Sequence, residues 1–463
     1  MLTIGIDVGT STVSGVVYDT ETKEVRASVT VPGSPYLYTD TPGGAEQSPE
    51  VLLSAVKKIL AELEEQVSGA EVIAFSTQMH GMLYIDRNGR PLSPLFTWED
   101  KRADQPIETS SLTGNVSLAE RISELTGYPT ATGYALATHR YNIRNGLVPD
   151  GVWKMVTAGD YCAMKICEGG DLEKEYLVDG DAVRPVMHPA TAASFGLYSI
   201  YEGCFDEIAL DILDITDVIL PRVGEYALAG HTPDGKEVYY STGDNQAGFI
   251  GAAGQPGDIL INIGTSAQIS GVLDTHGHSV GIDRELDLRP YMGDRYLVTG
   301  AALAGGSVLK ALNSVLLEII RMSDPKSTVT EEDMYVTMER MARTAYSEGR
   351  IRKVDTRFSG TRTEPGLRGS VQGLSTENLG FGPLCAGFYY GIVKELYDFY
   401  CLMPREVREE TGRVIMTGNA ARKNLVLLQI TEDLFGKKTV LSAWTEDAAV
   451  GAARYAALCA EHN

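Results

Sequence analysis

The sequence predicts an α/β protein with two related domains, and three observations support this prediction. The chain has 463 residues, enough for two or three domains of roughly 150 residues each. A strand, a Gly-Thr-Ser turn and a second strand are expected near the N-terminus, and the same pattern returns near residue 260. Segments with apolar residues at helical spacing follow the strands, as an α/β fold requires.

The first expected element is a β-hairpin followed by a helix. Residues 2–8 (LTIGIDV) and 13–19 (VSGVVYD) have the apolar, β-branched composition of buried strands, and GTST between them is a tight turn. Ser48 and Pro49 predict the start of a helix, because Ser caps helix N-termini and Pro is tolerated at the first helical position. The residues expected on its buried face recur every four positions: Val51, Ala55, Ile59 and Leu63. A strand at 71–76 then leads into the loop TQMHG.

The middle of the chain has a less regular pattern. Pro, Gly and Asp are frequent between residues 127 and 190, which favours an insertion or lid over core structure. The turn-rich stretch 224–235 predicts a domain boundary. We therefore expect an N-terminal domain at 1–229 and a C-terminal domain at 230–463.

The N-terminal hairpin has a second copy in the C-terminal domain. TIGIDVGTSTVSGVVYD at 3–19 resembles DILINIGTSAQISGVLD at 258–274. An isoleucine and the Gly-Thr-Ser turn coincide, and Ser-Gly-Val follows in both copies with an offset of one residue. Such a repeat at long period predicts that the two domains are duplicates.

Charge and composition exclude several classes of partner. Acidic residues outnumber basic ones 62 to 40, so the net charge is −22 and a general nucleic-acid or anionic-membrane binder is disfavoured. The six cysteines include no Cys-x-x-Cys pair, which favours reduced thiols in a cytoplasmic protein. The N-terminus lacks signal-peptide features and no run of 18 apolar residues occurs, so no membrane partner is expected.

Each Gly-Thr-Ser turn is a candidate phosphate site. Glycine lets the backbone approach a ligand closely, and consecutive N–H groups form a nest for phosphate oxygens. The residues are Gly9, Thr10, Ser11 and Thr12 in the first turn and Gly264, Thr265 and Ser266 in the second. Two copies predict a nucleotide cleft between the domains with one clamp on each wall, whereas a single copy would indicate an ordinary hairpin turn.

Asp7 is the candidate metal ligand. It directly precedes the first turn, where the second copy has Asn262. A carboxylate beside a phosphate nest is favourable when a cation lies between them, and Mg²⁺ is the oxygen-binding cation expected there, bound directly or through water. The alternative is an aspartate that caps its own turn.

Asp244 is the candidate general base. It follows the strand-like segment VYYST and precedes a helix of small residues, so its charged form is stabilised near a helix N-terminus. Its place at the domain junction, just before the second hairpin, favours catalysis. The alternative is an ordinary helix N-cap.

Small residues at strand-to-helix turns predict where an adenosine lies. Gly305 precedes a helix, and Gly418 follows a strand at 414–417, with Asn419 and Asn424 placed to hydrogen-bond the base or ribose. The helix after Gly305 is expected to bury Val308, Leu312, Leu316 and Ile319. Neither GxxxxGK[ST] nor GxGxxG occurs, which excludes a P-loop and gives a dinucleotide fold no support.

Together these motifs resemble the FGGY carbohydrate kinases of the actin-like ATPase superfamily, over nearly the whole chain. GIDVGTSTVSGVVYD and INIGTSAQIS look like the two phosphate motifs, TGDNQAG like the segment with the catalytic aspartate, and VIMTGNAARKN like the adenosine motif. Asn419 stands where the family usually has glycine. The resemblance implies two duplicated actin-like (ribonuclease H-like) domains, ATP and Mg²⁺ as cofactors, and Asp244 as the base.

The resemblance also places the sugar in the N-terminal domain. STQMHG at 76–81 looks like the loop of ketose kinases such as xylulokinase and sedoheptulokinase, and FTWEDKR at 96–102 resembles the family's Trp-x-Asp-x-Arg sugar loop. The candidate sugar-binding residues are Gln78, Met79, His80, Trp98, Asp100, Tyr134, Asp244 and Asn245. Several polar groups and one aromatic wall suit a sugar. The alternatives are a structural histidine and a tryptophan that belongs to the core.

The implied activity is phosphoryl transfer from ATP to a hydroxyl of a ketose, with Asp244 accepting the hydroxyl proton. A sugar-acid kinase of the gluconokinase type is the main alternative. An ATP-dependent binding switch without sugar phosphorylation is less favoured, because such relatives have no sugar loop. A sugar and ATP are the expected ligands, and a homodimeric assembly is left open.

Overall fold

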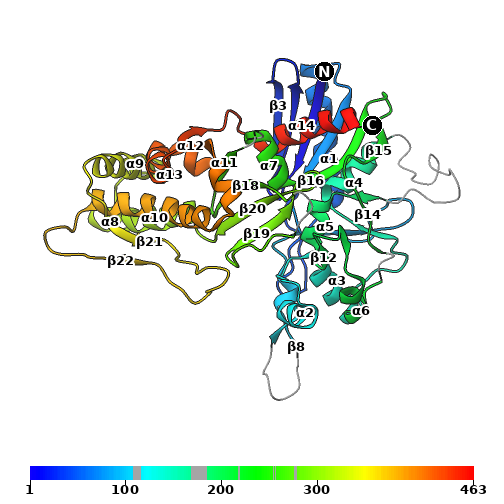
Figure 1. The fold of residues 1–463 in the computed structure, drawn as a ribbon, viewed down its shortest axis with the longest axis horizontal. Coiled ribbons are helices and arrows are strands. Elements are labelled where there is room, and N and C mark those ends of the chain that lie inside the picture. The colour runs from blue at the N-terminus through cyan, green and yellow to red at the C-terminus, as the bar shows by residue number, and fades with distance from the viewer. Residues whose placement is uncertain are drawn as a thin grey trace. The chain divides into compact units, whose positions relative to one another are not determined.

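A computed structural model describes residues 1–107, 116–167, 185–216, 219–253, 255, 257–275 and 279–462. The chain divides into two compact units. Unit 1 comprises Met1–Gly251, Pro290–Gly293 and Glu446–Asn463, and unit 2 comprises Ala252–Arg289 and Asp294–Thr445. Each unit is built around a six-stranded sheet (Figure 1).

The sheet of unit 1 has the strand order β15-β16-β5-β1-β2-β3. Its strands are β1 (Leu2–Val8), β2 (Thr12–Asp19), β3 (Glu24–Pro32), β5 (Val72–Thr77), β15 (Leu228–His231) and β16 (Glu237–Gly243). β1 pairs antiparallel with β2 and β2 pairs antiparallel with β3, whereas β5 pairs parallel with both β1 and β16. The expected N-terminal hairpin is therefore present, and its first strand lies at the centre of the sheet.

The sheet of unit 2 has the order β19-β20-β18-β17-β23-β24. Its strands are β17 (Asp258–Ile263), β18 (Ala267–Asp274), β19 (Leu286–Pro290), β20 (Arg295–Ala302), β23 (Arg413–Thr417) and β24 (Lys438–Leu441). Here β17, β18 and β20 are antiparallel neighbours, and β17, β23 and β24 are parallel. Five strands of each sheet pair in the same pattern, β16-β5-β1-β2-β3 in unit 1 and β24-β23-β17-β18-β20 in unit 2, whereas the sixth strands β15 and β19 lie at non-equivalent ends. The structure therefore confirms the predicted α/β duplication.

Helices accompany both sheets. The helices of unit 1 are α1 (Pro49–Gln66), α2 (Leu118–Thr126), α3 (Ala135–Arg144), α4 (Ala158–Ile166), α5 (Pro189–Phe195), α6 (Glu207–Ile212), α7 (Asp244–Ala252) and α14 (Asp447–His462). Those of unit 2 are α8 (Gly306–Ser323), α9 (Glu331–Ser347), α10 (Phe381–Leu402), α11 (Arg405–Glu410), α12 (Asn419–Lys423) and α13 (Leu425–Phe435). The red C-terminal helix α14 lies against the blue N-terminal strands in Figure 1.

Short elements complete the two units. In unit 1 they are β4 (Glu46–Gln47), β6 (Leu83–Ile85), β7 (Leu95–Phe96), η1 (Arg102–Asp104), β8 (Pro106–Ile107), β9 (Val116–Ser117), β10 (Lys154–Val156), β11 (Val186–Met187), β12 (Tyr198–Ser199), β13 (Cys204–Phe205) and β14 (Arg222–Val223). In unit 2 the strands β21 (Lys353–Asp355) and β22 (Ser370–Gln372) pair with each other.

The starts of the predicted helices are correct, but their buried faces are partly wrong. Ser48 caps α1 as expected, yet Val51 is 43% exposed, and the buried face runs through Leu52, Val56, Ile59 and Leu63. Residues four apart are about 400° apart around a helix, so a strict four-residue spacing drifts off one face. In α8 the expected Val308 and Leu312 are buried, but Leu317 is buried in addition and Ile319 is exposed.

The interpretation of 127–190 as an insertion or lid is wrong for α4, because this helix is core. Nearly all of its side chains are buried, and Tyr161, Cys162 and Ala163 belong to the cluster that holds the sheet of unit 1. Residues 168–184 lie outside the described part of the chain.

The expected boundary at 229/230 describes the duplicated sequence halves and stays a prediction. The bounds of the compact units differ from this boundary. Strand β16 pairs with β5 and helix α14 packs on β1, so both elements belong to unit 1 although they follow residue 229.

Two further observations concern the cysteines and the helices. All six cysteines are free thiols. Among the described helices, none has both the length and the apolar character that a membrane crossing needs.

Candidate active site

The ends of three parallel strands bring the two predicted acidic residues into one region of unit 1. In the sheet register Asp7 of β1 lies opposite Ser76 of β5, and Ser76 lies opposite Thr242 of β16. Asp244 follows two residues later as the first residue of α7. The carboxyl ends of parallel strands meet at one sheet edge, where ligands bind in α/β proteins.

The charges around Asp7 favour a cation. Burial raises the pKa of Asp7 to about 7 against the lowering effect of a hydrogen bond, and the charges of Asp244 and Glu446 raise it further. The hydrogen bond comes from Ser76 Oγ, 2.7 Å from Asp7 Oδ1. A divalent cation would relieve this mutual repulsion.

Asp7 fits a magnesium site in which the protein supplies few of the ligands. In the described residues no group of three or more His, Cys, Asp or Glu side chains is placed to hold a metal ion. Mg²⁺ commonly uses one or two carboxylates and keeps several waters. Asp7 therefore suits an ion bound mainly through water and phosphate oxygens.

A buried aspartate that the sequence interpretation missed braces the strand leading to Asp244. Asp160 Oδ1 accepts hydrogen bonds from Ser241 N at 2.8 Å and Ser241 Oγ at 2.7 Å. The sheet register shifts between Tyr239 and Thr242, so Ser241 lies at an irregularity of β16. Gly159 N donates to Thr77 Oγ1 at 3.0 Å, so the first turn of α4 is bonded to the ends of both β5 and β16.

Burial raises the pKa of Asp160 to about 6 although Ser241 hydrogen bonds oppose the shift. The folded protein therefore binds this proton more tightly than the unfolded chain, whose carboxyl has a pKa of 3.8. Its contribution to stability is present at low pH and is lost as the pH rises through about 6.

We expect Asp160→Asn to lack this loss, because the amide cannot ionise. Between about pH 5 and about pH 8 its free energy of unfolding should fall less than that of the wild type, by roughly 1.4 kcal/mol. Urea unfolding at both pH values measures the difference, with Asp211→Asn on the exposed face of α6 as the matched control. An unchanged pH dependence in Asp160→Asn would contradict the prediction.

The first Gly-Thr-Ser turn is joined to the predicted sugar loops. Gly9 N donates to Thr12 O at 3.1 Å and closes the turn. Thr10 Oγ1 donates to Gln78 Oε1 at 3.2 Å and accepts from Trp98 Nε1 at 3.0 Å. The half-exposed Trp98 ring and the buried Gln78 are thus held beside the turn.

The other predicted sugar residues form a second group around His80. His80 has a left-handed backbone with φ +70°, and its ring stacks on Tyr134 at 4.4 Å between centroids. Its N–H donates to Ser194 Oγ at 3.1 Å, and Nδ1 lies 2.8 Å from Ser194 O. A bulky residue with positive φ is strained, which marks a candidate functional position.

Asn245 connects the sugar loop to the candidate base. Its Nδ2 donates to Asp244 Oδ1 at 3.0 Å and lies 3.2 Å from Met79 Sδ. Two segments far apart in the sequence, 77–81 (TQMHG) and 242–246 (TGDNQ), are therefore neighbours in unit 1.

Asp100 does not face solvent in this fold. It is fully buried, and both of its oxygens bind the Arg102 guanidinium, at 2.8 and 2.9 Å. Ala45 N also donates to it, and Arg102 further contacts Glu46 and Asn142. The predicted sugar contact of Asp100 has no support in this arrangement, because its acceptor oxygens are already satisfied.

The predicted nucleotide residues of unit 2 mostly lie together. Gly305 N donates to Thr265 O at 2.9 Å, and a Cβ at Gly305 would lie 2.5 Å from Ser266 O. Gly418 has φ +90°, and a Cβ there would lie 2.4 Å from Ile263 O. The turn of Gly264, Thr265 and Ser266 is therefore flanked closely by the turns before α8 and α12.

Asn419 and Asn424 have different surroundings. Asn419 is exposed at the start of α12. Asn424 is buried, accepts a hydrogen bond from Tyr389 and donates to Ala420 O. The sequence could not show this, because Tyr389 is distant in the chain, and a nucleotide contact by Asn424 has no support here.

Three further residues around the site were missed in the sequence. Gln47 donates from its amide to Thr10 O at 2.8 Å, Ser194 holds His80, and Glu446 adds charge near Asp7. Only Glu446 had a local signal, as an acidic residue directly before a helix of small residues.

Comparison with known proteins agrees with the geometry. The model of the FGGY family of carbohydrate kinases, N-terminal domain, matches residues 2–232. The sedoheptulokinase of Mus musculus is 26% identical over 491 residues, covering 98% of this chain and 96% of that protein. A xylulose kinase of Staphylococcus epidermidis is 26% identical over 483 residues, covering 98% of this chain and 87% of that protein.

A solved structure shares the fold. The crystal structure of gluconate kinase from Lactobacillus acidophilus superimposes with a TM-score of 0.79 at 21% identity, covering 100% of this chain and 90% of that one. The matched family model, the nearly full-length relatives and the duplicated actin-like fold lead to one conclusion. This chain belongs to the FGGY family of carbohydrate kinases, which use ATP as the phosphate donor.

Proposed function

We propose that this carbohydrate kinase phosphorylates a ketose, with Asp244 as the general base and Mg-ATP as the donor. The observation that carries the proposal is the position of Asp244 at the start of α7, beside Asn245 and the sugar loop. A helix N-terminus stabilises the carboxylate form, which is the form that accepts a proton.

The proposed step moves one proton and one phosphoryl group. A sugar hydroxyl gives its proton to the Asp244 carboxylate while its oxygen forms a bond to the γ-phosphorus of ATP. The bond from that phosphorus to the bridging oxygen breaks, and ADP leaves with the electron pair. Asp7 would hold Mg²⁺, which supplies neutralisation of phosphate charge when bound.

The phosphate groups have backbone donors available in unit 1. In the described part of the chain, the amides of Thr10 and Ser11 have no protein acceptor. Successive N–H groups of this kind bind phosphate oxygens. We assign the equivalent turn of unit 2, with Gly305 and Gly418, to the rest of the nucleotide.

The hydrogen bonds around Asp100 support a narrower proposal for the sugar-binding residues. Trp98 supplies an exposed aromatic wall and His80 supplies a polar group, while the buried Gln78 holds the Thr10 turn beside them. Asp100 and Arg102 serve instead to hold the loop that carries Trp98.

A heptulose is favoured among ketoses. The chain spans 96% of the mouse sedoheptulokinase but 87% of the xylulose kinase, so its length matches the former more closely. The second candidate is a gluconokinase activity, which the similarity to gluconate kinase from Lactobacillus acidophilus favours.

An ADP-release assay tests the proposal. The purified chain is incubated with Mg-ATP and, separately, sedoheptulose, xylulose, ribulose, gluconate and glycerol. We expect ADP release that depends on a ketose, with sedoheptulose turned over at the highest kcat/KM. Preference for gluconate would replace the ketose assignment, and ATP turnover that no sugar changes would overturn the proposed reaction.

We expect Asp7→Asn to raise the Mg²⁺ concentration needed for half-maximal activity by about tenfold or more. Changes to residues that surround a bound metal commonly lower metal affinity by this amount. The amide keeps the shape of Asp7 and its hydrogen-bond acceptor for Ser76 but loses the charge. Activity is titrated with Mg²⁺ at fixed ATP, and Asp19→Asn at the other end of the same hairpin is the control. Superimposable Mg²⁺ titrations of Asp7→Asn and wild type would remove Asp7 from the metal site.

A further inference from the structure

Trp98 combines a closely packed backbone with a half-exposed ring. A Cβ added to Gly133 would lie 2.1 Å from Trp98 O, so these two segments of unit 1 are in close contact. Two residues after Trp98, the buried Asp100 is bonded to the Arg102 guanidinium. The indole ring is 48% exposed, and its one polar group, the Nε1–H, donates to Thr10 Oγ1 at 3.0 Å. The orientation of the ring therefore decides whether this hydrogen bond forms.

Three side chains hold Thr10, and Trp98 is the accessible one among them. Gln47 Nε2 donates to Thr10 O at 2.8 Å, and Thr10 Oγ1 donates to Gln78 Oε1 at 3.2 Å. Gln47 and Gln78 are buried, so a ligand does not reach the groups that make these two bonds. The hydrogen bond from Trp98 is thus the one that a molecule lying on the ring can strengthen.

Thr10 also carries one of the backbone amides that we assign to phosphate. The amides of Thr10 and Ser11 have no protein acceptor in the described part of the chain. Successive N–H groups bind a phosphate oxygen when they point toward one centre. The three hydrogen bonds to the hydroxyl and carbonyl of Thr10 restrict how its peptide groups are oriented. A group that fixes Thr10 therefore also prepares this turn for an anion.

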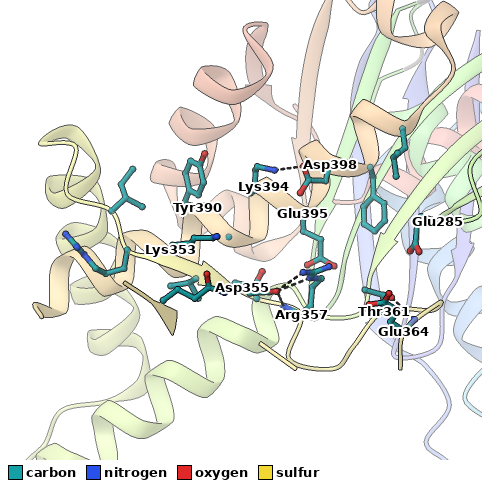
Figure 2. Close-up of a pocket in the computed structure, with 18 of the residues that line it drawn as sticks. Glu285, Lys353, Asp355, Arg357, Thr361, Glu364, Tyr390, Lys394, Glu395 and Asp398 are labelled. Carbon is teal, nitrogen blue, oxygen red and sulfur yellow. Dashed lines mark hydrogen bonds and ion pairs between the residues drawn. The ribbon is translucent and has the colours of Figure 1, made fainter. Parts of the chain in front are cut away.

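The second Gly-Thr-Ser turn is held in another way. The carbonyl of Thr265 accepts from the backbone amides of Gly305 and Ser307, at 2.9 and 3.0 Å. The cavity between β21 and α10 includes no residue of this turn, and charged side chains that line it pair with one another, as Lys394 does with Asp398 in Figure 2. Among the described residues, a side chain of a proposed sugar loop thus holds the first turn and not the second.

We propose that Trp98 is a positioning residue that couples sugar binding to nucleotide binding in this kinase. A sugar lying on the ring keeps the indole N–H on Thr10 Oγ1, and Thr10 then keeps its amide in the orientation that binds a phosphate oxygen. This inference rests on the proposed function, because it takes the Trp98 ring as a wall of the sugar site. The coupling is reciprocal, so a bound nucleotide raises the affinity for the sugar by the same factor.

Isothermal titration of the full chain with Mg-AMP-PNP, without sugar and with saturating sedoheptulose, measures the coupling; gluconate replaces sedoheptulose if ADP release prefers it. We expect the sugar to lower the Kd of the analogue about fivefold or more. Trp98→Phe keeps an aromatic wall but has no N–H, so the ratio of the two Kd values should fall to about 1. Thr10→Ser, which keeps the hydroxyl, should retain the wild-type ratio, whereas Thr10→Val should lose it.

A double variant tests whether both residues act through one hydrogen bond. Trp98→Phe and Thr10→Val remove the two ends of the same bond, so the double variant should show the ratio of either single variant. Trp153→Phe makes the same chemical change elsewhere in unit 1 and should keep the wild-type ratio.

The outcomes separate the coupling from the proposed function. If ADP release depends on a sugar but that sugar leaves the Kd of the analogue unchanged in the wild type, the coupling is wrong and the kinase assignment stands. A wild-type ratio retained by Trp98→Phe, or lost by Trp153→Phe, would likewise overturn the coupling alone. ATP turnover that no sugar changes would overturn both proposals.

Discussion

Asparagine in place of Asp244 is expected to lower kcat by roughly 10²- to 10⁴-fold, the usual scale for loss of a general base. The substitution preserves size, and the new side chain can still accept the hydrogen bond that Asn245 donates to Asp244 Oδ1. The fold and the sugar loop should therefore remain intact. What disappears is the carboxylate that takes the hydroxyl proton as the phosphoryl group is transferred.

Steady-state ADP release with the preferred sugar measures this effect. The KM for ATP should change much less than kcat, because the amide leaves the phosphate-binding turns untouched. Asp211→Asn on α6 is the matched control, since it makes the same chemical change at an exposed position. Turnover by Asp244→Asn within a few-fold of the wild type would remove Asp244 from the proposed mechanism.

The elements predicted correctly from the sequence are those with strong local patterns. The strands β1 and β2 combine β-branched runs with a Gly-Thr-Ser turn, and their second copy at β17 and β18 repeats both signals. Asp244 begins a helix because a strand and a glycine precede it and small residues follow. The start of α1 follows from Ser48 and Pro49 alone.

Two candidate site residues, Asp100 and Asn424, have surroundings that are set by contacts between distant parts of the chain, and their ligand contacts stay predictions. Asp100 looks like a sugar ligand until Arg102, Glu46 and Asn142 are seen to enclose it. Asn424 looks like a nucleotide ligand until Tyr389 is seen to occupy its carbonyl. Whether a polar side chain faces solvent depends on such partners, and spacing in one sequence does not reveal them.

The cytoplasmic location and a homodimer stay predictions.

The return of α14 to unit 1 is the least visible feature in the sequence and the one with the largest consequence for stability. Helices α7 and α14 touch through their backbones at two glycines. A Cβ on Gly451 would lie 1.7 Å from Ala247 O, and a Cβ on Gly251 would lie 1.9 Å from Asp447 O. The close contact between α7 and α14 therefore requires small residues in both helices, whether or not a ligand binds nearby.

We expect Gly451→Ala to destabilise the protein by roughly 3 kcal/mol or more, at or beyond the upper end for overpacked cores. The colliding atom is a backbone carbonyl oxygen, which cannot rotate away as a side chain would. Relief requires α7 to shift, and α7 begins with Asp244, so the protein that still folds should also lose kcat. Gly248→Ala is the matched control in α7, because its Cβ meets nothing within 4 Å and alanine favours the helix. Thermal unfolding of both variants measures the difference, and a Gly451→Ala protein with a Tm equal to that of Gly248→Ala would show that the two helices do not meet in this way.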